Sequence, residues 1–590
     1  MPVTATPARD AFSAAEPLAG SGGAGVTSGG RPVDLTRVLC LAAGTLLFLS
    51  YGFTEMAGSD MWWHVAAGRE LVQTRTLWMV DDWSWTALGH DWLNHEWLAD
   101  LIYYAWVAAW GVESLVYWKW LVIIATFVIL QVALTRDSGS ALAGLLCAGM
   151  AIAVAAPFLD VRPHLYSLLN YSLLLLLLLR RRTDTALLAV LFLVWVNLHG
   201  GFFFGLMALG ILLFPWRDFS LANLRGAFVT GLVCLLACTL NPSGVKTFLY
   251  PLTYAFDSVS PYRGLGEWLP PFQPGGIRSP LFFVAVWLPL LGLFYALPQV
   301  WRRVGVPWEG VALTLLTLAM ALTSRRFIPL FGISLAVMLA PLVGLFLRVC
   351  REERFAPAAA LAVLLYAGAR LAPYPLQAAP AFHYLTAEYS YPEDMLNFIE
   401  ANAITGRVYA LYNWGGYIHW RTDGRVRVFI DGRADTLFDA DTYHHYVGVL
   451  ASRPGWIEAV ERSGAEFMLW PHGRGSGQRK LEALVATGRW RPVYRDSVAW
   501  LLARTSVALP GELGPSPDTP ARDLTIAQVS ALDGEIDTAI RFAEKSLRAV
   551  PWHRGACNLL ASLHRQRGEA GRAATVVEEC RSYFPSAMLR

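Results

Sequence analysis

The sequence predicts a polytopic α-helical membrane protein with about eleven spans, followed by an external α/β domain and a C-terminal pair of α-helical repeats. The first observation is the composition, because the 590 residues are 55% hydrophobic and only 16% charged. The second is their order: apolar runs long enough to cross hydrocarbon follow one another from Val38 to Leu371, and charges return at ordinary frequency from Pro373 onward. The third is an internal repeat near the C-terminal end.

These changes in composition divide the chain into four parts. Residues 1–34 are rich in Ala, Gly, Ser and Pro and lack the pattern of a cleaved signal peptide, so we expect a disordered cytoplasmic tail. Residues 35–372 form the predicted membrane domain, residues 373–510 the α/β domain and residues 511–590 the helical repeats. The formal net charge of +3 is too small for a nucleic-acid surface, so nucleic acid is not an expected partner.

The apolar stretches of residues 35–372 are the candidate membrane helices. The stretch from Thr185 to Pro215 is ambiguous, because it can form one long helix or two short helices that meet at His199-Gly200-Gly201. With two short helices, spans are expected at residues 37–53, 113–134, 139–158, 164–179, 185–198, 200–215, 226–240, 280–299, 308–323, 327–347 and 356–372.

The arginines decide between the two alternatives. If the chain turns at His199, the arginines at helix ends fall on one side, which the positive-inside rule assigns to the cytoplasm. A single span would move Arg302, Arg303 and residues 351–354 to the outside. We therefore expect a multi-pass membrane protein, with its N-terminus in the cytoplasm and its C-terminal region outside. The predicted cytoplasmic arginines are Arg31, Arg37, Arg136, Arg180 to Arg182, Arg217, Arg225, Arg302, Arg303, Arg348, Arg351 and Arg354.

This topology places the polar loops on the external face, and the first of them, residues 54–98, holds the most reactive side chains. It reads Asp60-Met-Trp-Trp-His64, then Asp81-Asp-Trp-Ser, then His95-Glu96-Trp-Leu. Tryptophans belong at the level of lipid headgroups and acidic groups are easily solvated there, so an ordinary interfacial loop is one interpretation. A functional site is the other, and the residues alone leave both open.

A resemblance favours the site. The first-loop Asp60 with Trp-Trp-His64, a later Asp-x-x-Ser and His-Glu-Trp-Leu together resemble bacterial members of the GT-C glycosyltransferase superfamily. These polytopic enzymes are similar to the protein O-mannosyltransferases and to the lipid A aminoarabinose transferase. The resemblance continues through Arg162-Pro-His164, Trp195-Val-Asn-Leu-His199-Gly, Asn241-Pro-Ser-Gly244 and Arg325-Arg326-Phe-Ile-Pro329, so it covers the whole membrane region.

The resemblance implies catalytic roles. In that superfamily a first-loop carboxylate acts as base or binds a metal, and the sugar comes from a polyprenyl-phosphate carrier, so these roles fall on Asp60. Members with paired first-loop acids have a second carboxylate beside the first, whereas Met61 follows here. A single base is therefore expected, with Glu96 or Asp81 as partner. No cofactor is certain, and a divalent cation, magnesium or manganese, would bind at Asp60 if at all.

A carboxylate base fits the chemistry, because a hydroxyl acceptor must lose its proton as the bond to the anomeric carbon forms. The departing phosphate needs positive charge, which Arg325 and Arg326 can supply from the external end of an apolar helix. Contact with lipid headgroups is the alternative for both arginines.

Other polar residues of the external motifs are expected to bind substrate. His199 joins two short helices, so its turn should lie below the membrane surface, where it either lines a cavity or is satisfied by neighbouring carbonyls. Glu267 lies in a Pro- and Gly-rich loop that is either a lid or a linker. The expected substrate-binding residues, besides the two arginines, are His64, Asp81, His95, Asp160, Arg162, His164, His199 and Glu267.

The soluble region alternates strands and helices. Residues 407–411, 426–430, 466–470 and 498–502 are predicted strands, separated by helical patterns at 441–450 and 481–486. This alternation indicates a small α/β domain. Its Asp431-Gly-Arg433 run can bind a ligand, but a turn stabilised by an Asp–Arg pair is the favoured interpretation.

The last part contains a repeat with a period of 34 residues, in which Ala527 matches Ala561 and Gly534 matches Gly568. Ala539 with Ala573 and Pro551 with Pro585 continue the pattern of tetratricopeptide repeats. Two repeats bury little surface, so we expect them to dock on the α/β domain or on a protein partner through residues 524–585. Cys557 and Cys580 either form a disulfide or are two buried thiols.

Two functions remain in view. The leading hypothesis is a membrane glycosyltransferase that moves a sugar from a polyprenyl-phosphate donor to an acceptor on the external, periplasmic face. The alternative is a non-catalytic scaffold of an envelope-assembly complex that recruits partners through its repeats. A transporter is a weaker third option, because most spans lack the charges that ion coupling needs.

Overall fold

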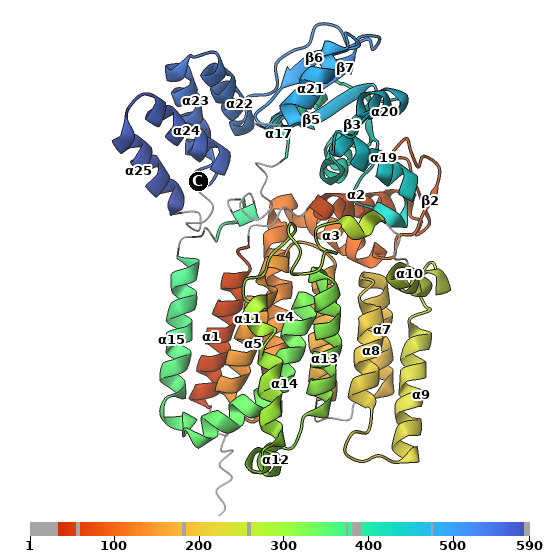
Figure 1. Cartoon of the computed structure of the whole chain (residues 1–590), viewed down its shortest axis with the longest axis vertical. Helices are drawn as coiled ribbons and strands as arrows, with labels where there is room; N and C mark the ends of the chain where they lie inside the picture. Colours follow the sequence, from red (N-terminus) through yellow and green to blue (C-terminus); the bar gives the residue numbers. More distant parts are fainter. Residues whose placement is uncertain are drawn as a thin grey trace, which may run out of the picture.

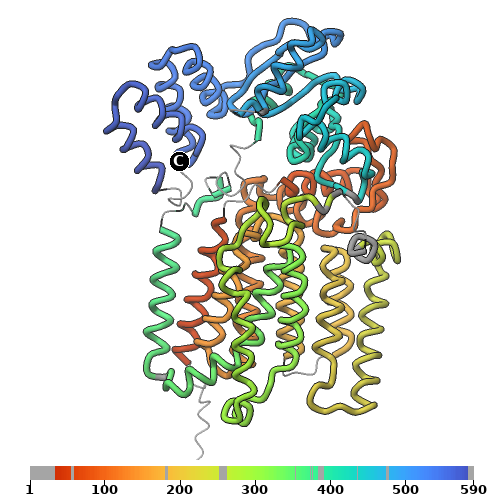
Figure 2. The backbone as a smooth tube through the Cα atoms, viewed as in Figure 1, coloured from red at the N-terminus to blue at the C-terminus, as the bar shows by residue number. Residues whose placement is uncertain are grey.

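The computed structural model describes residues 34–582 except for 55–58, 180–183, 257–260, 373, 375, 380, 383–390 and 474–475. Its helices form a bundle, and the α/β domain and the last four helices lie across one end of that bundle (Figure 1). Two helices of the first loop, α2 and α3, lie crosswise between the two layers (Figures 1 and 2). The predicted cytoplasmic residues Arg180 to Arg182 lie outside the described residues.

The bundle is built around α14, whose side chains are buried along most of its length. Small residues allow the close approach: a Cβ atom on Gly332 of α14 would lie 3.1 Å from the Ala151 carbonyl oxygen of α5, and one on Gly310 of α13 would lie 2.9 Å from the Met338 Cα atom. The bundle helices are α1 (Leu35–Tyr51), α4 (Leu115–Ser138), α5 (Ala141–Ala155), α6 (His164–Leu178), α7 (Thr185–Leu198), α8 (Phe202–Leu213), α9 (Leu221–Ala237), α13 (Trp308–Thr323), α14 (Ile328–Val349) and α15 (Ala356–Leu371).

The lengths of these helices do not confirm eleven spans. Within the described residues, three helical segments are long and apolar enough to cross a membrane by themselves, or four if one bent pair is counted as a span. They cover Val112–Ser138, Ala141–Phe158 and Arg325–Val349. Seven further apolar helices have between 10 and 17 residues. At about 1.5 Å per residue, a helix of that length is shorter than the roughly 30 Å hydrocarbon layer.

The stretch from Thr185 to Pro215 forms two helices, α7 and α8, so the alternative with a turn at His199 describes the chain correctly. The predicted helix at 280–299 is wrong in detail. It is broken into α11 (Phe282–Ala285), the 3₁₀ segment η4 (Leu288–Ala296) and α12 (Pro298–Val304). The axis of residues 282–296 and the axis of α12 differ in direction by 91°. Pro298, at the first position of α12, favours this break because it cannot continue the preceding hydrogen-bond ladder.

The first polar loop contains more regular structure than the sequence predicts. It holds α2 (Ser59–Thr74), the two-residue strands β1 (Met79–Val80) and β2 (Asp91–Trp92), and the start of α3 (Trp97–Trp110). A side chain on Gly68 would collide with the Asp100 carbonyl, so α2 and α3 pack backbone to backbone. A later loop forms α10 (Val245–Phe256).

The soluble region has one five-stranded sheet in the order β4-β3-β5-β7-β6. The three strands β4, β3 and β5 are parallel, and the remaining two are antiparallel. Four strands match the predicted positions, whereas β6 was not predicted. The elements are α17 (Glu393–Ala401), β3 (Gly406–Ala410), α18 (Gly415–Thr422), β4 (Val426–Val428), α19 (Ala440–Leu450), α20 (Trp456–Arg462), β5 (Phe467–Pro471), α21 (Ser476–Ala486), β6 (Trp490–Arg495) and β7 (Ala499–Arg504).

The first loop is joined to this domain by a buried ion pair. Arg433 Nη2 lies 2.6 Å from Asp81 Oδ1 and 2.7 Å from Asp431 Oδ2, and its guanidinium carbon lies 4.0 Å from the Trp83 ring centroid. The Asp431–Arg433 turn therefore forms as the sequence predicts. Beside it, the Val428 N–H of β4 donates to the Trp83 carbonyl at 3.0 Å, so loop backbone extends the sheet edge.

The last four helices are α22 (Pro520–Leu532), α23 (Ile536–Ala549), α24 (Arg554–Gln566) and α25 (Ala570–Arg581). The matched alanines are buried, and Gly534 and Gly568 have φ angles of +82° and +77°, which favour glycine where each helix pair turns. Cys557 and Cys580 form a disulfide. Both cysteines also belong to a hydrophobic cluster with Phe53 and Trp120, so this region contacts the end of the bundle.

Candidate active site at the bundle end

Polar side chains from four separate segments meet at the end of the bundle that faces the α/β domain. Asp60 lies in the first turn of α2, and Arg162 precedes α6. Arg162 Nη2 is 2.6 Å from Asp60 Oδ2, and its Nη1 is 2.6 Å from Glu267 Oε2. Arg326, in the 3₁₀ turn before α14, completes the chain, because its Nη1 lies 3.8 Å from Glu267 Oε1. We call these four residues the charged cluster.

The charges of this cluster stabilise one another. Burial alone would lower the pKa of Arg162, but the carboxylates of Asp60 and Glu267 outweigh burial and hold that pKa well above its usual value. Burial raises the pKa of Glu267, yet Arg162 and Arg326 outweigh it and lower the pKa to about 2. Arg162 and Glu267 therefore remain ionised across the physiological range.

A second group surrounds the buried carboxyl of Glu96 with imidazole rings. His64 Nε2 lies 3.7 Å from Glu96 Oε2, while His95 Nε2 and His199 Nε2 lie 3.7 Å and 3.6 Å from Glu96 Oε1. On its other side, His64 Nδ1 is 2.5 Å from Asp100 Oδ1. We call Glu96 and the three histidines the imidazole group.

Hydrogen bonds orient two of these rings. The Gly201 N–H donates to His199 Nδ1 at 2.9 Å, so a neutral His199 carries its proton on Nε2 and points it toward Glu96. His64 Nδ1 shares a hydrogen bond with Asp100 Oδ1, and burial raises the pKa of this Asp100 carboxyl well above its usual value. His199 thus offers a hydrogen-bond donor to Glu96, and His64 links Glu96 to a second buried carboxyl.

Burial shifts the groups toward their neutral forms. It lowers the pKa of His64 to about 4 and raises the pKa of Glu96 to about 7. It also lowers the pKa of His199 well below its usual value. Asp60 and Arg162 are among the charges that act on the pKa of His64, so the charged cluster and the imidazole group are electrostatically coupled. A carboxyl that titrates near neutrality suits proton transfer.

We predict that this titration is visible in the folded protein. The infrared carbonyl band of protonated Glu96 should disappear as the pH rises through about 7, and Glu96→Gln should lack this transition. The ordinary pKa of a glutamic acid is 4.5, so the folded state binds this proton more tightly than the unfolded state does. As the pH rises from about 4.5 to about 7, the wild type should therefore lose stability relative to Glu96→Gln. A band that is already absent at pH 5 would contradict this assignment of the proton.

Asp160 and His164 lie beside the charged cluster. His164 Nε2 contacts the Phe158 carbonyl at 2.6 Å and Asp160 Oδ1 at 3.6 Å, and Asp160 Oδ2 is 3.9 Å from Arg162 Nε. The buried Lys119 of α4 donates to Thr54 Oγ1 at 3.2 Å and acts electrostatically on Asp160. Lys119 was not predicted as a site residue, although a lysine within an apolar run is the signal that could have found it.

Two predicted site residues, Asp81 and Arg325, contact other parts of the chain and lie outside the charged cluster. Asp81 is held by Arg433 at the junction with the α/β domain, and this partner lies 352 positions away and is invisible in the local pattern. The substrate-binding role of Asp81 stays a prediction. The guanidinium of Arg325 is buried and donates to the backbone carbonyls of Pro270, Gln273 and Gly275. The loop therefore occupies the donors that were expected to hold phosphate, whereas Arg326 remains partly exposed.

Both carboxylate oxygens of Asp60 have partners within the chain. Asp60 Oδ2 pairs with Arg162, and Asp60 Oδ1 accepts from Ser59 Oγ at 3.1 Å. Among the described residues, no group of three or more His, Cys, Asp or Glu side chains is placed to hold a metal. The sequence also missed Asp100 and Asn94, which donates to Asp100 Oδ2 at 2.8 Å.

The chain resembles solved structures along most of its length. No protein-family model and no curated protein sequence matches it. The crystal structure of the apo oligosaccharyltransferase of Archaeoglobus fulgidus matches with a TM-score of 0.51 at 12% sequence identity, covering 90% of this chain and 86% of that chain. The oligosaccharyltransferase AglB of the same organism, in complex with an inhibitory peptide and a dolichol-phosphate, gives the same four values. The chain therefore has a helical membrane-protein fold with an α/β domain, similar to that of this archaeal oligosaccharyltransferase.

Proposed function

We propose that the protein is a membrane glycosyltransferase that moves a sugar from a polyprenyl-phosphate donor to an acceptor on the side of the α/β domain. The observation that carries this proposal is the charged cluster, where carboxylates and arginines from four segments meet between the bundle and that domain. The fold supports it, because the similar archaeal transferase has been solved with a dolichol-phosphate. We assign this face to the periplasm of a bacterial inner-membrane protein.

Arg326 is the proposed ligand of the donor phosphate. Its side chain is 27% exposed and its only close carboxylate among the described ion pairs, Glu267, is 3.8 Å away. Its guanidinium carbon lies 4.0 Å from the Trp268 ring centroid, which orients the charge without using its hydrogen-bond donors. A phosphate oxygen can therefore bind this guanidinium, and the contact persists as negative charge develops on the leaving group.

Asp60 is the proposed base. One of its oxygens pairs with Arg162, and the other lies where a Cβ atom on Gly432 of the α/β domain would be 3.2 Å away. An acceptor hydroxyl that arrives between the two layers would meet this carboxylate, which can take its proton as the glycosidic bond forms. Glu96 is the proposed second group, which exchanges a proton with the histidines around it.

The scaffold is not proposed as a second function. The repeat region contacts the end of the bundle through the cluster of Phe53, Trp120 and the disulfide, and α22 contacts α17 of the α/β domain. These contacts within the chain account for docking of the repeats. A protein partner for residues 524–585 remains a prediction.

The test of this function is the affinity for a lipid-linked sugar. Arg326→Ala should weaken binding of a polyprenyl-phosphate sugar in nanodiscs by about 10- to 100-fold, because a hydrogen bond to a charged group is worth about 1.5–3 kcal/mol. Arg278→Ala is the matched control, since Arg278 is an exposed arginine of the loop that precedes α11, and this variant should bind donor normally. If wild type, Arg326→Ala and Arg278→Ala bind donor equally, or none binds it, the proposed function is wrong.

A further inference from the structure

A polar cavity lies at the opposite end of the bundle from the charged cluster. Its volume is about 470 Å³, within the range of small-ligand sites. Three arginines from different segments line it: Arg217 follows α8, Arg303 lies in α12 and Arg348 lies in α14. The other lining residues are Asp137, Ser138, Gly139, Val304 and Pro341. None of these residues belongs to the site proposed for sugar transfer.

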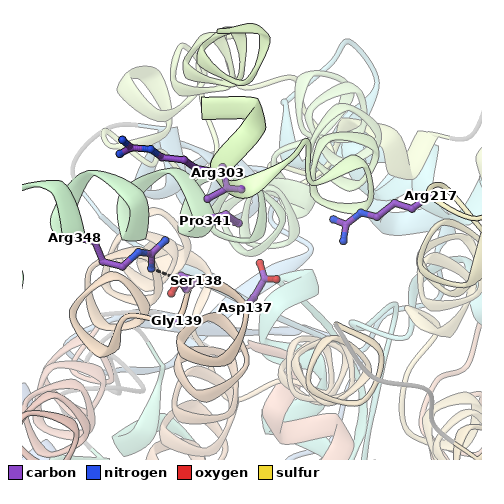
Figure 3. Close-up of a pocket in the computed structure, with 8 residues that line it drawn as sticks. Asp137, Ser138, Gly139, Arg217, Arg303, Pro341 and Arg348 are labelled. Carbon is purple, nitrogen blue, oxygen red and sulfur yellow. Dashed lines mark hydrogen bonds between the residues drawn. The ribbon is translucent and has the colours of Figure 1, made fainter. Parts of the chain in front are cut away.

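A hydrogen bond and a helix bend bring two of the arginines to this cavity. Arg348 Nη1 donates to the Ser138 carbonyl at 2.5 Å, which fixes this cation at the C-terminal end of α4. The 91° bend before α12 carries Arg303 to the same cavity, where a straight helix would lead it away. Figure 3 shows Arg217 and Arg348 approaching from opposite sides, with Asp137 between them.

The charge of the lining is mostly positive. Arg217 has one distant carboxylate partner, with its Nη2 3.9 Å from Glu309 Oε2, and keeps 59% of its side chain exposed. The lining thus contains three arginines and one carboxylate, Asp137. Guanidinium groups bind phosphate oxygens through paired hydrogen bonds, and a cavity at the end of a membrane bundle lies at the level of lipid headgroups.

We propose that this cavity binds the phosphate of an anionic phospholipid headgroup. Arg217 and Arg303 bind the phosphate oxygens, and Arg348 holds the cavity wall against α4 while adding to its positive charge. The site is thus a specific contact with the membrane leaflet opposite the α/β domain.

The experiment measures lipid retention by the full-length protein. After reconstitution in an equimolar mixture of phosphatidylglycerol and phosphatidylcholine, native mass spectrometry should show one retained phosphatidylglycerol per protein. The double variant Arg217→Gln with Arg303→Gln should reduce this retention by about tenfold or more. Arg302→Gln is the matched control, because Arg302 is an exposed neighbour on α12 that does not line the cavity. Binding of the sugar donor should be unchanged in all three proteins.

Three outcomes would overturn the proposal. The first is equal retention of the two lipids by wild type. The second is an equal loss in Arg302→Gln, which would reveal a general attraction between basic residues and anionic lipid. The third concerns inorganic phosphate added to the protein in pure phosphatidylcholine discs. If it raises the thermal stability as much as phosphatidylglycerol does, the cavity is a site for free phosphate.

Discussion

Asp60→Asn is expected to lower the rate of sugar transfer by about 10²- to 10⁴-fold, the usual contribution of a positioned general base. The amide keeps the shape of the side chain but cannot accept the acceptor's proton. Donor affinity should stay near that of wild type, because the interaction of a base with the moving proton strengthens mainly in the transition state. Single-turnover transfer and equilibrium donor binding, measured on the same nanodisc preparation, separate the two effects.

A first-loop acid outside the charged cluster provides the control for this result. Asp82 is an exposed carboxylate of the same loop, and Asp82→Asn should transfer sugar at the wild-type rate. Asp60→Asn also removes an ion-pair partner of Arg162. Glu267→Gln is the control for this indirect effect, because it removes the other close carboxylate partner of Arg162 and leaves Asp60 intact. Equal transfer by Asp60→Asn and wild type would exclude Asp60 as the base.

Arg433→Ala is expected to destabilise the protein by about 3–5 kcal/mol, because it leaves two buried carboxylates without their cation. The side chains of Asp81 and Asp431 are 0% exposed, and both contact this one guanidinium. The loss should appear as a lower midpoint of thermal unfolding and as faster proteolysis of the first loop, which this ion pair joins to the α/β domain. Transfer should also fall, because Gly432 adjoins Asp60.

An exposed ion pair of the same domain is the comparison for this prediction. Arg407 Nε lies 3.8 Å from Glu466 Oε2, with 46% and 35% of the side chains exposed, so Arg407→Ala should cost about 1 kcal/mol or less. A triple variant that combines Arg433→Met with Asp81→Asn and Asp431→Asn should recover part of the stability, because it removes the stranded charges together with the cation. If Arg433→Ala and Arg407→Ala unfold alike, the junction does not depend on this ion pair.

The sequence predicts the helices of the bundle well and their lengths poorly. Apolar runs identify α4, α5 and α14 because hydrocarbon and protein interiors both select the same residues. The run at 280–299 has the same composition, but its prolines break it into pieces that the composition does not separate. Whether an apolar helix crosses a membrane or stops short depends on its neighbours, which a single stretch of sequence does not contain.

The candidate site is predictable in its residue types and not in its pairings. Asp60, Arg162 and Glu267 were chosen as polar residues of separate loops, and the structure brings them together across gaps of about a hundred residues. Arg325 and Arg326 are neighbours in sequence, yet one donates to loop carbonyls and the other contacts Glu267 and Trp268. Their directions follow from a 3₁₀ turn that no local pattern distinguishes from a helix end.

The most direct test of the account is the identity of the lipid that co-purifies with the protein. Mass spectrometry of wild type extracted from its native membrane should detect a polyprenyl-phosphate sugar, and incubation with an acceptor should convert it into the sugar-free carrier and a glycosylated product. Arg326→Ala should carry much less of this lipid, and Asp60→Asn should retain it without converting it. Wild type that carries no glycosylated lipid, and that transfers no sugar when one is supplied, would contradict the account.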